Sequence, residues 1–537
     1  MASAGIAAHD IGMTFAARGT TTTVLDRLSV AITPGSFVTL LGPSGCGKST
    51  LLKILGGILE PTHGQVTIAG KTAAEAVRRK QIGLVLQRPA LLPWKTAREN
   101  VLLLRSIAKK DGEVAKAAAD EALDLVGLTH AADRLPHELS GGMAQRVSIA
   151  RALAMDPSIL LMDEPFGALD AITREAMNEN LARIWAATGK TIVFVTHSIP
   201  EAVFLSDTVH VMAANPGRIV DTVDIDIQRP RTEDTMGIPE FAEYSTHLRE
   251  RLHPGPRGWR DTVTLAQSRT TEQMETNKSV SIRRFWQRIW PPLLLVVAVI
   301  VVWELIIDLL GSMTFVIAKP SEIAAELVTE AEILSRATWI TTQEVLWGFL
   351  VSIVVGSALA LVVVRFRWVE RAVYPLIVLF QVVPKVALAP IFILWFGYAM
   401  SPKLVLIVVM AFFPITINMV LGLKRTEDDL ILLMRSVGSS KNQIMARIQI
   451  PNSLPYLFAG MRIGVTLAVI GAVVAEFAGS QNGLGYLIQF ASTQLDTPLM
   501  FAALVVVSVL GLIFYYLIGL IEVLLRNRFA HLALPAE

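Results

Sequence analysis

The stretch GPSGCGKST (residues 42–50) has the residue types and spacing of a phosphate-binding loop. It fits the pattern G-x-x-x-x-G-K-[ST], in which small residues let backbone N–H groups face phosphates at the start of a helix. A glycine-rich turn matched by chance is the alternative, but the strand-like FVTLL precedes the loop and the helical LLKILGGIL follows it. The predicted nucleotide contacts are Gly42, Pro43, Ser44, Gly45, Cys46, Gly47, Lys48, Ser49 and Thr50.

Individual residues of this loop have predictable chemistry. Lys48 would reach the β and γ phosphates, and the Ser49 hydroxyl would bind Mg²⁺. Cys46 lies near the predicted helix N-terminus, so we expect a favoured thiolate that bound ATP protects from alkylation. It is the only cysteine, which excludes an intrachain disulfide and fits a reducing compartment.

Two adjacent carboxylates follow a second apolar run, SILLMDEP (residues 158–165). At the end of a buried strand, Asp163 could hold Mg²⁺ and Glu164 could orient an attacking water.

Composition divides the chain into two halves. The hydrophobic fraction of 53% and the mean hydropathy of +0.51 exceed those of an ordinary soluble protein. Residues 1–280 alternate apolar and polar positions, whereas residues 291–525 contain long uncharged runs. The net charge of +2 predicts no nucleic-acid surface. We predict a soluble domain at 1–254, a linker at 255–280 and a membrane domain at 281–537; a small regulatory domain is the alternative for the linker.

Six stretches are apolar and near the roughly 20 residues that a helical span needs. They are residues 291–310, 345–364, 372–396 with an interruption, 404–421, 458–477 and 500–525. Arginine and lysine gather before the first, between the second and third, between the fourth and fifth, and after the last. The positive-inside rule predicts that both termini are cytosolic. The start, MASAGIAAHDIG, has no signal-peptide pattern, which agrees.

The sequence LSGGMAQR (residues 139–146) lies between the two phosphate motifs, and with them most of residues 6–225 resembles the ATPase of an ABC transporter. This resemblance implies an α/β P-loop fold that hydrolyses ATP with Mg²⁺. It implies that Glu164 is the general base, that His197 senses the γ phosphate, and that Gln87 contacts Mg²⁺. It further implies nucleotide contacts at Phe15, Ser140, Gly141, Gly142 and Asp170, although Phe15 could equally be a core residue. Met143 replaces the glutamine of many relatives.

In this family the signature serine and glycines close on ATP held by the opposite subunit. The resemblance therefore implies that two ATPases must pair. With one ATPase and one membrane domain per chain, a homodimer is the simplest complete transporter.

Residues 285–530 resemble the all-α, six-helix permease of type I ABC importers for nitrate, sulfonates, taurine, aromatic carboxylates and thiamine-pyrimidine precursors. The stretches ALAPIFILWFG and VIGAVVAEFAGSQNGLGYLI carry this resemblance. Gly438 precedes the IQIP element that ends at Pro451, at the spacing of the family's coupling loop. Leu432, Leu433 and Met434 replace the usual acidic and small residues, and an ordinary amphipathic loop is the alternative.

The stretch VVPKVALAP (residues 382–390) places two prolines and a lysine within the third apolar run. Such a break is stable only where protein or a water-filled cavity satisfies the freed carbonyls. We therefore expect Lys385, with Asn418 and Glu476, to line a pathway for an anionic solute. The alternatives are that Lys385 pairs with Glu476 or extends toward the membrane surface.

The combined expectation is an importer in the bacterial cytoplasmic membrane that works with an extracellular solute-binding protein. An exporter with the ATPase first is one alternative, but that group lacks the coupling-loop element. An ATP-gated channel or a signalling ATPase is another, against which Glu164 and His197 predict turnover rather than ATP binding alone.

Overall fold

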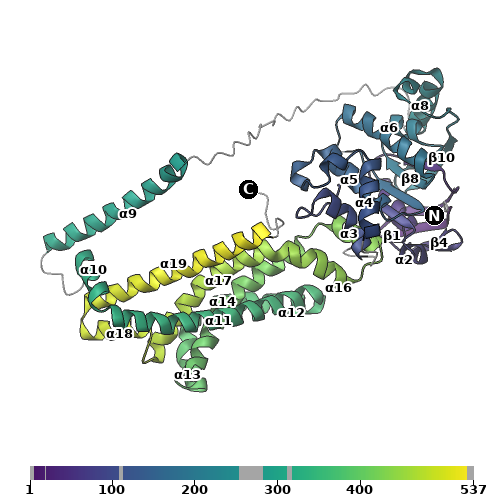
Figure 1. The fold of residues 1–537 in the computed structure, drawn as a ribbon. Coiled ribbons are helices and arrows are strands. Elements are labelled where there is room, and N and C mark those ends of the chain that lie inside the picture. The colour runs from purple at the N-terminus through teal and green to yellow at the C-terminus, as the bar shows by residue number, and fades with distance from the viewer. Residues whose placement is uncertain are drawn as a thin grey trace. The chain divides into compact units, whose positions relative to one another are not determined.

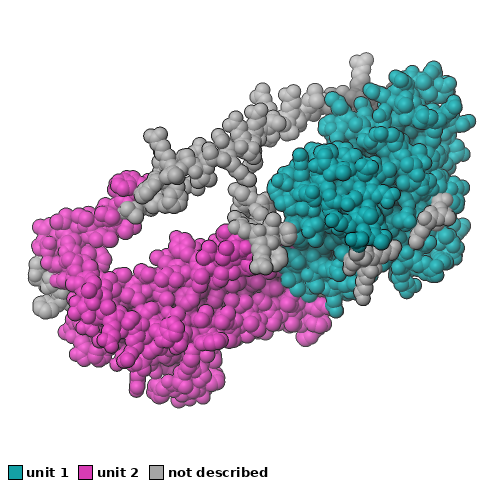
Figure 2. All heavy atoms as spheres, viewed as in Figure 1, with its two compact units in different colours: residues 1–258, 426–451, 529–537 teal, residues 259–425, 452–528 magenta. Residues whose placement is uncertain are grey.

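The computed structural model describes residues 5–17, 20–107, 113–167, 169–252, 282–310 and 317–528. The chain forms two compact units, which Figure 2 shows in different colours. Unit 1 comprises residues 1–258, 426–451 and 529–537, and unit 2 comprises residues 259–425 and 452–528. A segment from the apolar half of the sequence therefore belongs to unit 1. The predicted linker, residues 255–280, lies outside the described residues.

Unit 1 is built on a six-stranded sheet with strand order β10-β9-β3-β8-β7-β6. Its strands are β3 (Phe37–Leu41), β6 (Ile82–Val85), β7 (Ile159–Asp163), β8 (Thr191–Thr196), β9 (Thr208–Ala213) and β10 (Arg218–Asp224). All pairs are parallel except β9 with β10. The central strands are almost wholly apolar and buried, as expected for a parallel sheet covered on both faces. Strands β3, β8 and β7 are neighbours, so their carboxyl ends meet at one edge.

A second, antiparallel sheet has the order β2-β1-β4-β5. Its strands are β1 (Ile6–Ala17), β2 (Thr20–Ile32), β4 (His63–Ile68) and β5 (Lys71–Thr72). Phe15 lies near the end of β1, opposite Thr22 of β2. Small β-branched threonines dominate β2 beside it, which suits a half-exposed strand.

The helices of unit 1 connect the strands and begin at capping residues. Ser140, Asp170 and Ser198 each accept a backbone hydrogen bond at a helix N-terminus, which satisfies an otherwise free N–H group. The helices are α1 (Lys48–Leu55), α2 (Ala73–Arg78), α3 (Ala97–Ile107), α4 (Glu113–Leu125), α5 (Gly141–Leu153), α6 (Ala171–Thr188), α7 (Ile199–Leu205), α8 (Pro239–Leu252), α15 (Asp428–Ser436) and α16 (Lys441–Ile444) (Figure 1).

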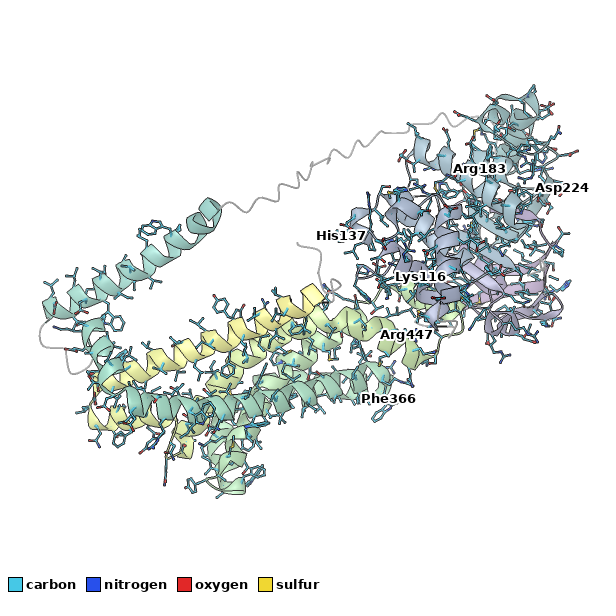
Figure 3. The ribbon with its side chains drawn as sticks, in the orientation of Figure 1. Lys116, His137, Arg183, Asp224, Phe366 and Arg447 are labelled. Atoms are coloured by element: carbon cyan, nitrogen blue, oxygen red, sulfur yellow. The ribbon has the colours of Figure 1, made fainter. Side chains whose placement is uncertain are left out.

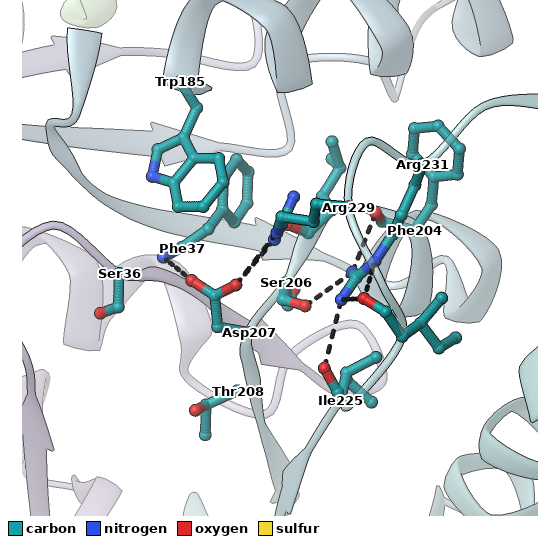
Figure 4. A network of polar contacts seen from close by, with 12 residues as sticks. Ser36, Phe37, Trp185, Phe204, Ser206, Asp207, Thr208, Ile225, Arg229 and Arg231 are labelled. Atoms are coloured by element: carbon teal, nitrogen blue, oxygen red, sulfur yellow. Dashed lines mark hydrogen bonds and ion pairs between the residues drawn. The ribbon is translucent and has the colours of Figure 1, made fainter. Parts of the chain in front are cut away.

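A network of arginines fixes the chain after β10 against the start of β3 (Figure 4). Asp207 accepts a hydrogen bond from Phe37 N at 2.8 Å and another from Arg229 Nη2 at 2.8 Å. Arg231 is buried and donates to the carbonyl oxygens of Phe204 and Ser206. Burial lowers the pKa of Arg231 to about 10, yet every donated bond ends on a carbonyl oxygen, so the charge is well solvated by the backbone.

Unit 2 is helical. Its helices are α9 (Ile282–Leu310), α10 (Pro320–Thr329), α11 (Ala331–Arg365), α12 (Arg367–Val382), α13 (Ala389–Phe396), α14 (Met400–Lys424), α17 (Ile450–Gly479), α18 (Leu484–Gln494) and α19 (Thr497–Arg528). Within the described ranges, four helical stretches are long and apolar enough to cross a membrane: 331–365, 400–424, 441–479 and 497–525. They contain four of the six predicted spans. The first predicted span falls on α9, and the third on α12 and α13.

The third predicted span is interrupted where the sequence indicates. Helix α12 ends at Val382, a short 3-10 turn covers Lys385–Leu388, and α13 begins at Ala389. Pro384 precedes this turn and Pro390 lies in the first turn of α13, where its missing N–H costs nothing. The predicted break is confirmed.

Glycines bring α11 and α14 close together. A Cβ atom at Gly348 would lie 2.5 Å from Ile407, and one at Gly356 would lie 2.9 Å from the carbonyl oxygen of Phe412. Larger residues would force the helices apart, and close approach between apolar helices is a main source of their packing energy in a membrane.

Candidate functional site

The predicted phosphate-binding loop joins β3 to α1 and has the backbone that its glycines permit. Gly45 and Gly47 have φ values of 83° and 93°, which side-chain-bearing residues rarely adopt. A Cβ atom at Gly42 would lie 2.7 Å from the carbonyl oxygen of Met212, so only glycine fits there. Lys48 is 4% exposed, and its Nζ donates to the carbonyl oxygens of Gly42 at 2.7 Å and Pro43 at 3.0 Å. The loop thus holds the ammonium group beside the N-terminus of α1.

The second motif lies against this loop. Ser49 Oγ donates to Asp163 Oδ1 at 2.8 Å, and Lys48 Nζ lies 3.7 Å from Glu164 Oε1. Glu164 Oε2 lies 3.2 Å from Nδ1 of His197, directly after β8. Burial raises the pKa of Asp163, while the Ser49 hydrogen bond and Lys53 oppose this shift. The parallel sheet therefore brings together side chains that are more than a hundred positions apart.

Ser49 and Asp163 could bind Mg²⁺ only if a nucleotide supplied further ligands. Ser49 and Asp163 offer two adjacent oxygens, the ligand type that Mg²⁺ prefers. In the part of the chain that the structure describes, no three His, Cys, Asp or Glu residues are grouped as a metal site. Phosphate oxygens and water would have to complete the shell, which is usual for Mg²⁺ bound with ATP.

Gln87 follows β6 and is held by residues that the motif analysis did not single out. Gln145 Nε2 donates to the carbonyl oxygen of Leu86 at 3.1 Å. Arg151 donates to the carbonyl oxygens of Pro89 at 2.7 Å and Ala90 at 2.6 Å. Complete burial lowers the pKa of Arg151 to about 9. Helix α5 therefore fixes the loop on both sides of Gln87 through contacts that are 59 and 61 positions apart in the sequence, which a local pattern does not reveal.

The signature lies at the N-terminus of α5, beside the start of α6. Ser140 Oγ accepts a hydrogen bond from Met143 N at 3.3 Å, and Ser140 and Gly141 are exposed. Gly142 is buried, and a Cβ atom there would lie 2.8 Å from Thr173. Asp170 Oδ1 accepts from Thr173 N at 2.9 Å. The signature and Asp170 thus lie close together in unit 1, and Ser140, Gly141 and Asp170 are exposed there.

Two predicted nucleotide contacts have contrasting environments. Phe15 is 43% exposed on β1, as an adenine-stacking ring needs to be. Cys46 is 1% exposed, and burial raises the pKa of its thiol despite the nearby Lys48. The predicted favoured thiolate is therefore wrong, because desolvation of the charged form outweighs the helix N-terminus and the lysine.

The coupling segment, residues 426–451, packs into the core of unit 1. Leu433 and Met434 are 0% exposed, so the residues that depart from the usual pattern supply apolar contact. Gly438 ends α15 with a φ of 74°, and Pro451 lies in the first turn of α17. Arg447, labelled in Figure 3, donates to Ser106 Oγ of α3 at 3.1 Å. The segment belongs to an apolar cluster of unit 1. From the segment the cluster contains Leu430, Leu433, Met434, Val437, Ile444 and Ile448, and from the rest of unit 1 it contains, among others, Val77, Ile82, Leu92, Trp94, Leu103 and Ile107.

The three polar residues predicted to line a pathway do not meet. Lys385 Nζ lies 5.4 Å from the centre of the Phe413 ring, and Asn418 Nδ2 donates to the carbonyl oxygen of Pro414 at 2.8 Å. Glu476 accepts from Thr341 Oγ1 at 2.7 Å and from Gly485 N at 2.5 Å, so it caps α18. Among the described residues no hydrogen bond or ion pair joins Lys385 to Glu476, and the alternative of a pair is wrong.

A different lysine forms the buried ion pair of unit 2. Lys403 of α14 donates to Glu344 Oε1 of α11 at 2.6 Å and to Ser480 Oγ at 2.7 Å. This pair lines a cavity of about 400 Å³ with Gln343, Tyr398, Ser480, Gln481 and Asn482. Sequence inspection missed Lys403 because it falls one residue before the apolar stretch 404–421, where a lysine is usually exposed.

Both halves match known families. A model of the family described as ABC transporter matches residues 25–167. A model described as binding-protein-dependent transport system inner membrane component matches residues 352–527.

Curated relatives agree for the first half. A taurine import ATP-binding protein of Rhizobium johnstonii is 48% identical over 245 residues, which cover 44% of this chain and 93% of that protein. A putative ATP-binding protein of Brucella abortus is 47% identical, over 41% of this chain and 83% of that protein. A bicarbonate transport ATP-binding protein of Synechocystis is 44% identical, over 40% of this chain and 76% of that protein. The chain belongs to the ABC transporter family and joins an ATPase to a membrane permease component in one polypeptide.

Proposed function

We propose that the protein is an importer that uses ATP to move a small polar, anionic solute across the bacterial cytoplasmic membrane. The coupling segment is the observation that carries the proposal. This part of the permease sequence is buried in the ATPase core with residues of β6, the strand that precedes Gln87. ATP-dependent movements of that core would therefore act directly on the helices α14 and α17 that flank the segment. Relatives named for taurine and bicarbonate transport support the class of solute.

The working form is a homodimer in which each ATP lies between the phosphate loop of one chain and the signature of the other. Ser140 and Gly141 are exposed, so their hydrogen-bond donors would be accessible to the phosphates of ATP bound to a second chain. Lys48 would bind the β and γ phosphates, and Glu164 would accept a proton from water. Mg²⁺, held by Ser49, Asp163 and Gln87, would supply charge stabilisation of the phosphates.

His197 would stabilise the γ phosphate, held in place by its contact with Glu164. Asp170 would contact the partner's site, and Phe15 would stack on adenine.

The ATPase domain spans residues 1–254 and the permease domain 281–537, with both termini in the cytosol. In the permease, Lys385, Asn418, Glu476 and the cavity beside Lys403 are the candidate solute contacts. An extracellular solute-binding protein would deliver the solute.

The energy of ATP suffices for this task. Concentrating a solute a thousandfold costs about 4 kcal/mol, and an anion that moves against a membrane potential costs about 2.3 kcal/mol more per charge and 100 mV.

The test is ATP hydrolysis by the full chain in lipid nanodiscs, with solute-binding proteins of the same host added one at a time. Each is loaded with taurine, nitrate or bicarbonate, and the unloaded protein is the control. Import predicts that one loaded binding protein stimulates hydrolysis several-fold. A rate that responds only to compounds on the ATPase side would support the exporter, and passive flux with a non-hydrolysable ATP analogue would support the channel.

A further inference from the structure

Glu201 is a buried carboxylate that no motif of the ATP site includes. It lies in the first turn of α7, is 5% exposed, and burial raises its pKa. A buried carboxylate is costly unless its partners compensate, so the identity of those partners indicates its role.

One side of Glu201 holds the residue before the switch histidine. Thr196 Oγ1 donates to Glu201 Oε2 at 2.5 Å. The same hydroxyl accepts a hydrogen bond from Ser198 N at 3.0 Å, so Thr196 and Ser198, on either side of His197, share one anchor. The Glu201 carboxylate therefore holds the backbone on both sides of His197 through the Thr196 hydroxyl.

The other side of Glu201 reaches the loop before Asp170. Arg174 Nε of α6 lies 3.7 Å from Glu201 Oε1, and among the described residues this nitrogen has no hydrogen-bond partner. Arg174 Nη2 donates to the carbonyl oxygen of Leu169 at 2.8 Å. Arg174 thus connects the carboxylate to the residue that precedes Asp170.

We propose that Glu201 is a positioning residue that couples the His197 turn to the Asp170 loop through Thr196 and Arg174. Both loops would face ATP, His197 in its own site and Asp170 toward the partner's site. A single carboxylate holding both would make the switch histidine reach its catalytic position only when the inter-subunit loop is in place. The proposed role gives Glu201 no contact with ATP or with the attacking water.

The test compares steady-state ATP hydrolysis of the full chain with Glu201→Gln, Arg174→Met and the double variant. The amide still accepts a bond from Thr196 but loses the charge that attracts Arg174. We expect kcat to fall about tenfold while KM for ATP changes less than about twofold, because catalytic groups are misplaced but the phosphate loop is intact. The double variant should be no slower than Arg174→Met alone, since both changes break one connection.

Two variants of Thr196 test the other contact and leave the Glu201 carboxylate unchanged. Thr196→Val should lower kcat as Glu201→Gln does, and Thr196→Ser, which retains the hydroxyl, should restore it. Lys190→Met, which breaks the ion pair of the buried Lys190 with the exposed Asp156 elsewhere in unit 1, is the matched control and should leave kcat unchanged at equal loss of thermal stability. The proposal is overturned if the losses of kcat caused by Glu201→Gln and Arg174→Met multiply in the double variant. It is also overturned if Glu201→Gln has a normal kcat. Because the readout is hydrolysis alone, it does not depend on the direction of transport.

Discussion

At the scale of single residues, two adjacent carboxylates have different surroundings. Asp163 is bound by the Ser49 hydroxyl, whereas Glu164 lies between the ammonium of Lys48 and the imidazole of His197. Glu164 has a positive φ of 42°. That backbone is rare for a residue other than glycine, and such strain occurs mainly at functional positions.

Glu164→Gln should retain ATP binding and nearly abolish turnover. The amide keeps the size of the side chain but cannot accept a proton from water, which typically costs about a hundredfold or more in kcat. Steady-state hydrolysis and equilibrium ATP binding are the measurements, with the exposed Glu175→Gln as control. Hydrolysis within a few-fold of wild type would remove Glu164 as the base.

Cys46 should react slowly with maleimide in the folded chain, with or without ATP. Its burial and raised pKa keep the thiol protonated and inaccessible, so labelling should accelerate only above the pH at which a free cysteine ionises. Labelling after denaturation gives the reference rate. Fast labelling at neutral pH that ATP suppresses would contradict the described environment and restore the thiolate predicted from the sequence.

At the scale of elements, sequence reasoning succeeded where a local pattern determines a local structure. The phosphate loop, the strand before Asp163 and the break at Pro384 follow from spacing, apolar runs and proline chemistry. It failed where long-range packing decides: Cys46 is buried by distant residues, and the partner of Lys403 lies on another helix. It also could not show that Leu433 and Met434 join an apolar cluster, because members of that cluster such as Trp94 and Leu103 are remote in sequence.

Leu433→Asp should disconnect the coupling segment from the ATPase. A charge in this fully buried position would be desolvated among apolar side chains, which costs several kcal/mol unless the segment leaves the cluster. We expect basal ATP hydrolysis within about twofold of wild type and loss of stimulation by a loaded binding protein. Asn442→Asp, at an exposed position of the same segment, is the control. Preserved stimulation in Leu433→Asp would contradict the role of this contact.

Lys403→Met should destabilise the permease by about 3–5 kcal/mol, because it leaves the Glu344 carboxylate buried without its cation. Adding Glu344→Gln to Lys403→Met should recover much of that loss. Thermal unfolding in detergent measures both effects, and Lys319→Met, which breaks an exposed pair with Asp308, should leave Tm unchanged. Equal Tm values for wild type and Lys403→Met would mean that the pair is not part of the folded membrane domain.

At the scale of the whole molecule, the proposed homodimer would contain two equivalent ATP sites, each composed of residues from both chains. A chain with Lys48→Ala lacks a working phosphate loop, and a chain with Ser140→Arg lacks a working signature. Each homodimer should be inactive, but a mixed dimer contains one intact site. Random co-assembly should therefore recover up to about a quarter of wild-type hydrolysis. Activity of the mixture no higher than that of the separate variants would argue against shared sites.

The most direct test is solute transport by proteoliposomes that contain the full chain with its ATPase outside. The vesicle lumen holds the solute-binding protein of the same host with labelled taurine, nitrate or bicarbonate, and ATP is added outside. Import predicts ATP-dependent movement of one solute from the lumen to the ATPase side, absent in Glu164→Gln. ATP-dependent accumulation in the lumen, or movement without hydrolysis, would contradict the proposal that this protein is an importer.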